Sequence, residues 1–354
     1  MVRIVFAGDI MLARGVGEKL LVDYKDLISS DIKQILKNAD LCVGNLECPI
    51  TVNGKKQKET SFKASPDSLT QVDDFSLLSL ANNHVYDCGL NGVKETIDTL
   101  NNGEVKWCGI VENPTKHIEP VVFNINGKTL AFYGCVVDEC SKGEKDWFPK
   151  VIEISRSELW DAIKLNSNKF DKTIILLHGG NEMIPYPQPS FKSTCQKFID
   201  SGADLVITSH PHVLGGYEKY KKGFIFYSLG DFIFDADSFI RKRGLLLSVN
   251  LYDDNFDFEF IPTLIDANYR VTLAHKKVKK GIINKIRKVS TEISNPNYSK
   301  KYSLFFYQSL LKFQIDRLVY LLRRKGFIYF LKFIFKKVNL ISHYFRVVAK
   351  KEYK

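Results

Sequence analysis

The chain has 354 residues and a mass of 40.5 kDa, enough for one large domain with an extension or for two modest domains. Apolar residue types make up 45% of it and charged types 26%, a balance typical of globular proteins that excludes a wholly disordered chain. The net charge of +11 combines an acidic body, −7 over residues 1–274, with a basic extension, +18 over residues 275–354, so a general affinity for nucleic acid does not describe the body.

The first segment, MVRIVFAGDI, predicts a strand and lacks the regions of a secretory signal. No stretch reaches the roughly 18 uncharged apolar residues that a membrane-spanning helix needs. The seven cysteines are scattered and contain no CxxC pair, as is typical of reduced proteins. We therefore expect a cytoplasmic protein.

Short β-branched and aromatic runs alternate with helical patterns over the first 210 residues. Strands are predicted at 2–7, 41–44, 75–80, 105–108, 121–125, 129–135, 173–177 and 205–208. Helices are predicted near 28–38, 66–73, 90–102, 155–168 and 189–201. The stretch 224–264 is typical of strands, with a hairpin turning at 253–255. This order predicts an α/β body with a mixed or two-sheet core.

Polar side chains follow several of these strands, at the edge where open α/β sheets bind ligands. Asp9 follows the first strand, and Asn45 and Glu47 follow the second. Carboxylates there suit a divalent cation. Alternatively, Asp9 caps a helix and Glu47 is a buried acid with a structural partner.

A second polar segment, Asn82-Asn83-His84, ends the apolar run LLSLA. An amide oxygen is a neutral metal ligand, and an adjacent imidazole can protonate a leaving group. Asp87 is placed to orient His84 or to cap the next helix. A purely structural turn remains the alternative.

Histidine is sparse in this chain, yet four of the seven lie at strand ends. His178 closes the run TIILLHGG, and Glu182 follows it at four residues. His210 and His212 flank Pro211, so two imidazoles can be presented to one site or to neighbouring ions. A lone histidine at a strand end is otherwise more often a hydrogen-bonded structural residue.

Arg14 and Lys63 are the cations expected nearest this edge. An anionic substrate would need them, although a solvated surface charge is the ordinary role of either residue.

Seven motifs in order closely resemble the CapA (PGA-cap) family, which is linked to capsule and poly-γ-glutamate formation. They are GDIMLAR (8–14), GNLECPIT (44–51), FKASP (62–66), LANNHVYDCG (80–89), HGGNE (178–182), GADLVITSHPHVLGG (202–216) and YSLGDFIFD (227–235). The resemblance covers roughly residues 2–240. The family is similar to the calcineurin-like metallophosphoesterases, which implies a four-layer α/β/β/α sandwich with a metal centre at the strand ends.

The resemblance implies a role for each matching residue. His84 is the catalytic histidine, with Asp87 beside it, and Glu47 is the acid that bridges the metal ions. The implied metal ligands are Asp9, Glu47, Asn83, His178, His210 and His212. Residues expected to contact substrate are Arg14, Asn45, Lys63, Asn82 and Glu182.

The chain also departs from the phosphoesterase pattern. Those enzymes have Asp-x-His at the first motif, whereas Met11 follows Asp9 at that spacing here. One ligand of the first ion is therefore missing, and Asp231 stands where this branch usually has Asn. Many members carry an N-terminal membrane anchor that is not expected here.

We therefore expect a metal-dependent enzyme of capsule or cell-envelope polymer biosynthesis, of hydrolase or transferase type, acting on an anionic amide- or phosphate-containing polymer or peptide. One or two divalent ions (Mn, Zn, Fe or Ca) would polarise water or a substrate oxygen. The alternatives are a metal-dependent peptide epimerase on the same fold and a non-catalytic, metal-binding scaffold of an export complex.

The predicted organisation is a CapA-like domain over residues 1–270 and a basic, amphipathic helical tail over 271–354. Apolar residues recur at helical spacing between Leu304 and Leu322, among many Lys and Arg. This composition favours the inner face of an anionic membrane, where each nearby charge adds about 1 kcal/mol. A helical hairpin packed on the acidic body is the alternative, and nucleic acid is not an expected partner because no nucleic-acid motif accompanies the charge.

Overall fold

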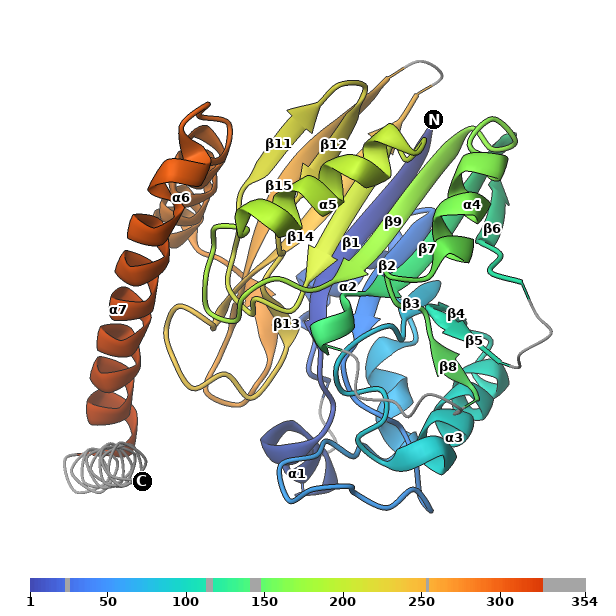
Figure 1. Cartoon of the computed structure of the whole chain (residues 1–354). Coiled ribbons are helices and arrows are strands. Elements are labelled where there is room, and N and C mark those ends of the chain that lie inside the picture. Colours follow the sequence, from blue (N-terminus) through green and yellow to red (C-terminus); the bar gives the residue numbers. More distant parts are fainter. Residues whose placement is uncertain (23–25, 113–116, 141–147, 253–254, 327–354) are drawn as a thin grey trace, which may run out of the picture.

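The computed structural model describes residues 1–22, 26–112, 117–140, 148–252 and 255–326. Two large β-sheets form its centre (Figure 1). The first sheet has the order β16-β15-β14-β1-β2-β3-β4, with β13 also paired to β1. Its strands are β1 (Val2–Ile10), β2 (Leu41–Leu46), β3 (Leu77–Ser79), β4 (Lys106–Cys108), β13 (Asp231–Ile233), β14 (Arg243–Leu251), β15 (Phe256–Ile265) and β16 (Val271–Leu273).

The second sheet has the order β11-β12-β10-β9-β7-β6. Its strands are β6 (Val121–Ile125), β7 (Lys128–Val136), β9 (Lys172–His178), β10 (Leu205–Ser209), β11 (Tyr217–Tyr220) and β12 (Gly223–Phe226). The short strands β5 (Ile110–Val111) and β8 (Lys150–Val151) form a separate pair. The inner strands of both large sheets are parallel, so their carboxyl ends lie along one edge.

Apolar side chains fill the space between the two sheets, where Phe6 and Val43 of the first meet Phe132 and Ile174 of the second. Helices cover the outer faces. The first sheet packs against α1 (Arg14–Val22), α2 (Ser30–Lys37) and α3 (Gly89–Asn102), and the second packs against α4 (Ser157–Asn166) and α5 (Pro189–Asp200). Strands such as β1 and β2 are apolar almost throughout because both of their faces are buried. The expected four-layer α/β/β/α sandwich is confirmed.

Most expected elements are present, with small shifts at their ends. The segment expected as a helix at 66–73 is a 3₁₀ helix, Pro66–Val72, and β1 continues to Ile10, so Asp9 lies inside a strand and caps no helix. Helix α1 was not expected, since Gly15 and Gly17 lower the helix propensity of its sequence. Strands β14 and β15 form the expected hairpin, but two of its turn positions, 253–254, lie outside the described residues.

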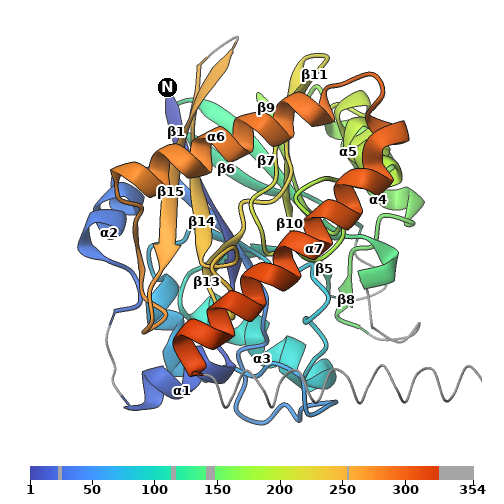
Figure 2. The ribbon, with the colours of Figure 1, turned by 90° about the vertical axis from the view of Figure 1, so that its left-hand side faces the viewer.

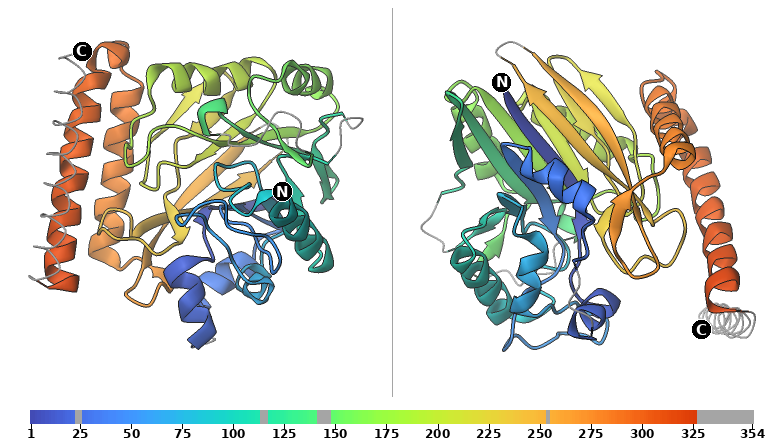
Figure 3. Two further views of the ribbon diagram at one scale, coloured as in Figure 1. Left: turned by 60° about the horizontal axis from the view of Figure 1, so that its bottom comes forward. Right: turned by 180° about the vertical axis from the view of Figure 1, so that it is seen from behind.

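The carboxyl-terminal extension begins with two helices, α6 (Lys276–Ile293) and α7 (Tyr298–Lys325). They lie together along one side of the body (Figure 2, Figure 3). Helix α6 contacts β15 of the first sheet and β11 of the second, and its Ile282 and Ile286 join the core between the sheets. Asp316 of α7 accepts a hydrogen bond from the backbone N–H of Ile240 at 2.9 Å. Helices α6 and α7 are therefore packed on the body, as in the helical hairpin that the sequence left as an alternative.

The rest of the predicted tail, residues 327–354, lies outside the described residues. Among the helices that the structure describes, none has the length and apolar character required to cross a bilayer. The division of the chain at residue 270 remains a prediction; β16, just beyond it, pairs with β15.

Candidate metal centre at the strand ends

Three neighbouring strands bring polar side chains to one point of the first sheet. Asp9 of β1 is in register with Asn45 of β2 on one side and with Asp231 of β13 on the other. Across the core, His178 ends β9 in register with Ser209, the last residue of β10. The parallel topology therefore gathers these side chains at one edge.

Asp9 is fully buried and its carboxylate has several donors. Asn45 donates to Asp9 Oδ1 at 2.8 Å, and the backbone N–H of His210 donates to Oδ2 at 3.3 Å. His212 Nδ1 lies 3.3 Å from the same Oδ2. These contacts fix Asp9 at the centre of the polar cluster.

Glu47 follows β2 and is also fully buried, yet neither of its carboxylate oxygens has a hydrogen-bond partner among the described residues. Its Oε1 lies 3.8 Å from His178 Nε2 and 3.6 Å from His212 Nε2. Burial raises the pKa of this carboxyl well above its usual value, and the nearby charge of His212 offsets only part of that rise. A buried carboxylate without donors is the arrangement that a cation would complete.

The His-Pro-His segment forms a tight turn after β10. His210 has φ of 100° and His212 has φ of 55°, the left-handed region that residues other than glycine rarely adopt. This turn directs both rings into the cluster. Nδ1 of His210 is buried without a partner in the described residues, and burial together with the charge of His212 lowers the pKa of His210 to about 4.

His212 is held by a carboxylate on the far side. Its Nδ1 donates to Asp231 Oδ1 at 2.8 Å, and Arg241 donates to Asp231 Oδ2 at 3.1 Å. Burial alone would lower the pKa of His212, but Glu47 and Asp231 raise it well above its usual value. Arg241 thus pairs with Asp231. His212 bonds to Asp231 as well and also lies close to the carboxylates of Asp9 and Glu47.

His178 lies between the two sheets with both ring nitrogens engaged. Nε2 is 2.8 Å from Asn83 Oδ1 and Nδ1 is 3.0 Å from Ser209 Oγ. Burial lowers its pKa well below the usual value, so the ring is neutral, the form that binds metals.

Two sets of side chains have ligand atoms within 4.8 Å of one another: Glu47, His178 and His210 form one set, and Asp9, Glu47 and His212 form the other. Glu47 is common to both. The unpartnered atoms of Glu47 and His210, and the mixture of carboxylate and imidazole donors, fit a divalent cation in each set. Asn83, through its bond to His178, lies beside the first set.

Met11 does not take part in this cluster. It is buried, and its sulfur accepts a hydrogen bond from the backbone N–H of Ala13 at 3.1 Å. The ligand that phosphoesterases have at this position is therefore absent, as the sequence indicates.

His84 lies at the partly exposed rim of the cluster. Its Nδ1 donates to Asp87 Oδ2 at 2.7 Å, and its ring stacks on Phe62 with centroids 3.8 Å apart. The same Asp87 oxygen accepts the backbone N–H of Phe62 at 2.6 Å. The expected orienting contact from Asp87 to His84 is therefore present.

The structure places the residues expected to bind substrate in different regions. Asn45 and Asn82 lie in the cluster, where Asn82 donates to the carbonyl of Leu46 at 2.8 Å. Arg14 and Lys63 line one cavity of about 360 Å³, together with Lys56, Glu18, Asp67 and neighbouring residues.

Arg14 and Lys63 are already engaged with other groups of the chain. Arg14 pairs with Asp235, and its guanidinium lies 4.6 Å from the centroid of the Phe62 ring. Lys63 donates to the carbonyls of Val52 and Gly54. Glu182 is exposed, and its negative charge acts on the pKa of His210.

The sequence did not assign a role to Arg241 or Ser209, and it noted Asp231 only as a departure. Asp231 follows the glycine of YSLGDF and begins β13, and a carboxylate directly after a glycine between two apolar segments is the signal that could have identified it. Arg241 has no such signal, because the loop between β13 and β14 brings it to Asp231.

Comparisons with known proteins agree with this architecture. Residues 3–236 match the family model described as bacterial capsule synthesis protein PGA_cap. The capsule biosynthesis protein CapA of Bacillus anthracis is 32% identical over 263 residues, which cover 70% of this chain and 63% of that protein. The PGA biosynthesis protein CapA of Bacillus subtilis is 29% identical over 296 residues, which cover 80% of this chain and 77% of that protein.

Among solved structures, a Staphylococcus aureus protein assigned as a 5'-nucleotidase, crystallised with alpha-ketoglutarate, is 14% identical with a TM-score of 0.50. It covers 81% of this chain, which corresponds to 58% of that protein. This likeness shows the fold, which is that of the metallophosphoesterases. The matched part of the chain spans less than two thirds of the Bacillus anthracis relative.

Proposed function

Since the chain belongs to the bacterial capsule synthesis protein PGA_cap family, we propose that it is a metal-dependent enzyme of capsule or cell-envelope polymer biosynthesis. Its substrate would be an anionic polymer or peptide that contains amide or phosphate bonds, and the reaction would be a hydrolysis or a transfer. The observation that carries the proposal is the shared, unpartnered carboxylate of Glu47 between two sets of buried ligands.

The ligand sets would hold one or two divalent cations through Asp9, Glu47, Asn83, His178, His210 and His212. A cation bound there would supply Lewis-acid polarisation of a substrate oxygen. Asp231 and Arg241 would keep the His212 ring in its orientation.

His84 is the proposed proton donor because it is partly exposed beside the buried cluster. Asp87 would orient the ring through its hydrogen bond and hold it against Phe62. Arg14 and Lys63 line the adjacent cavity, where their charges would attract an anionic substrate despite their existing partners.

The purified protein, loaded with Mn²⁺ or Zn²⁺, is expected to act on at least one member of a panel of γ-glutamyl peptides, α-glutamyl peptides, phosphomonoesters and phosphodiesters. Chelation should abolish this turnover, and adding the metal again should restore it. Product formation is followed by mass spectrometry in deuterated water.

The same panel separates the alternatives. Deuterium that enters a peptide without cleavage would identify an epimerase. Bound metal with no turnover on any member of the panel would favour the scaffold and contradict an enzymatic role.

We further propose that α7 places the protein on an anionic membrane surface. One face of α7 exposes large apolar side chains at helical spacing: Leu304, Tyr307, Leu311, Ile315, Val319 and Leu322. Lys300, Lys301, Arg323 and Arg324 near its ends are exposed cations. Apolar residues with flanking positive charge are the combination that binds at the interface of anionic lipid.

Replacing Leu311 and Ile315 together by Asn should release the protein from vesicles that contain phosphatidylglycerol, because both side chains are more than half exposed and contribute apolar area to the interface. Co-sedimentation with vesicles at low and high salt measures this. Leu165→Asn, at a still more exposed apolar position on α4, is the control. Equal sedimentation of both variants would remove α7 as the membrane contact.

A further inference from the structure

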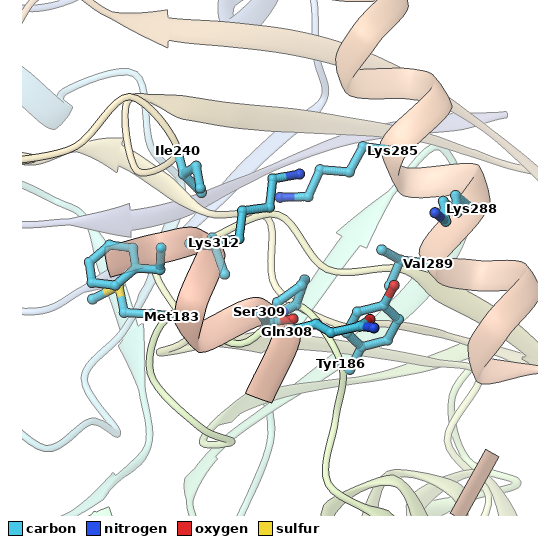
Figure 4. A pocket seen from close by; sticks show the side chains of 12 residues that line it. Met183, Tyr186, Ile240, Lys285, Lys288, Val289, Gln308, Ser309 and Lys312 are labelled. Carbon is cyan, nitrogen blue, oxygen red and sulfur yellow. The ribbon is translucent and has the colours of Figure 1, made fainter. Parts of the chain in front are cut away.

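A second polar cavity lies between α6, α7 and the segment that contains Met183 and Tyr186 (Figure 4). Its volume is about 180 Å³, which is smaller than the roughly 300–1,000 Å³ typical of a pocket for a whole ligand. Lys285 and Lys288 of α6 and Lys312 of α7 line it. We call this cavity the lysine pocket. It has room for one side chain or functional group.

The lysine pocket brings together three positive charges, of which Lys285 is partly buried while Lys288 and Lys312 are exposed. Within the described part of the chain, none of them forms an ion pair or a side-chain hydrogen bond. The amino groups of Lys285 and Lys312 point toward each other (Figure 4). Burial and the charge of Lys312 lower the pKa of Lys285 to about 8.

Asp316 is the acid that acts on Lys285, and it already accepts the backbone N–H of Ile240. Like charges so close together repel one another, and an anion bound between them would relieve this repulsion.

Segments that line the lysine pocket also carry or contact residues of the metal centre. Val213 directly follows His212, and the N–H of Met183 donates to the carbonyl of Pro211 at 2.8 Å. Ile240 precedes Arg241, the partner of Asp231. Three separate segments therefore line the pocket and also position side chains of the metal centre.

The lining favours a carboxylate over a phosphate. Phosphate sites in proteins typically use helix N-termini, backbone N–H groups or an arginine fork. Here the charges come from lysines in the middle of two helices, and no arginine lines the pocket. The remaining wall includes Val213, Val289 and Phe313, which suit the methylene groups of an aliphatic acid.

We propose that the lysine pocket is a second substrate subsite, which binds a carboxylate on an aliphatic spacer while another part of the same chain-like substrate lies at the metal centre. This inference rests on the proposed function, because it deepens the assignment of an anionic polymer as substrate. It predicts that affinity increases with the length of the polymer.

The test uses the full chain and isothermal titration with glutamate, a linear glutamate decamer and inorganic phosphate. Lys285→Gln/Lys312→Gln should weaken binding of the decamer about tenfold or more, since two cationic donors to the bound carboxylate are lost. Lys279→Gln/Lys280→Gln removes the same charge from exposed positions of α6 outside the pocket and should change the affinity by less than about twofold. Glutamate alone should bind weakly to all three proteins.

Thermal unfolding and metal content of both double variants verify that they are folded. The subsite would be overturned if both double variants lost the same affinity for the decamer, or if the wild-type protein did not bind the decamer. Binding of phosphate but not of the decamer, lost only in the pocket variant, would overturn its assignment to carboxylates. Because binding is measured without turnover, a protein that binds the decamer through the pocket but is inactive on every substrate contradicts the proposed function and leaves the subsite standing.

Discussion

Glu47→Gln is expected to remove bound divalent cations from both ligand sets, whereas Asp9→Asn and His210→Ala should each remove the cation of one set. Glu47 belongs to both sets, while Asp9 and His210 belong to one each. An amide lacks the negative charge that balances a buried cation, and a missing imidazole leaves a gap in the coordination. Metal content after dialysis against Mn²⁺ or Zn²⁺, measured by plasma emission, should fall from about two ions per chain to about none for Glu47→Gln and to about one for the others.

His117→Ala is the matched control, because this histidine is exposed and lies outside both sets. If a single ion is bound, Glu47→Gln should still remove it, and only one of the other two variants should match that loss. Unchanged stoichiometry in Glu47→Gln would contradict the site as described. If His117→Ala lost as much bound metal as the ligand variants, the bound metal would be adventitious.

The order of strands and helices was accessible from the sequence because the apolar runs of β1, β2, β9 and β10 are continuous and end in polar residues. Parallel strands with polar carboxyl ends imply a common edge, and Asp9, Glu47 and His178 were found there for that reason. Helix α1 was missed because its glycines oppose helix formation in isolation, while burial of Val16 and Leu20 favours it in the folded protein.

The electrostatic surroundings of the site could not be predicted in the same way. Arg241 reaches Asp231 through a loop whose path is set by tertiary packing, and no local pattern records that path. The pairing of Arg14 with Asp235 joins residues more than two hundred positions apart. Composition likewise described the extension only by its charge, whereas α6 completes the core between the two sheets through Ile282 and Ile286.

Replacing His84 should affect turnover and metal content differently from replacing a metal ligand. His84→Ala is expected to lower kcat about 10²–10⁴-fold on the substrate that the panel identifies, the range ordinarily lost with a general acid. Its metal content should remain near that of the wild type, because His84 bonds to Asp87 and belongs to neither ligand set. Kinetics and plasma emission on the same preparation measure both quantities.

Asp87→Asn gives the companion result. The amide is a neutral partner that holds the His84 ring less firmly than the carboxylate, so kcat should fall about 10–100-fold, as for the loss of a residue that supports an active group. Lys172→Gln, which removes a charge at the opposite end of β9, should leave the rate unchanged. If His84→Ala loses metal and regains activity when metal is supplied in excess, His84 is a ligand, and the proton must come from another group at the rim.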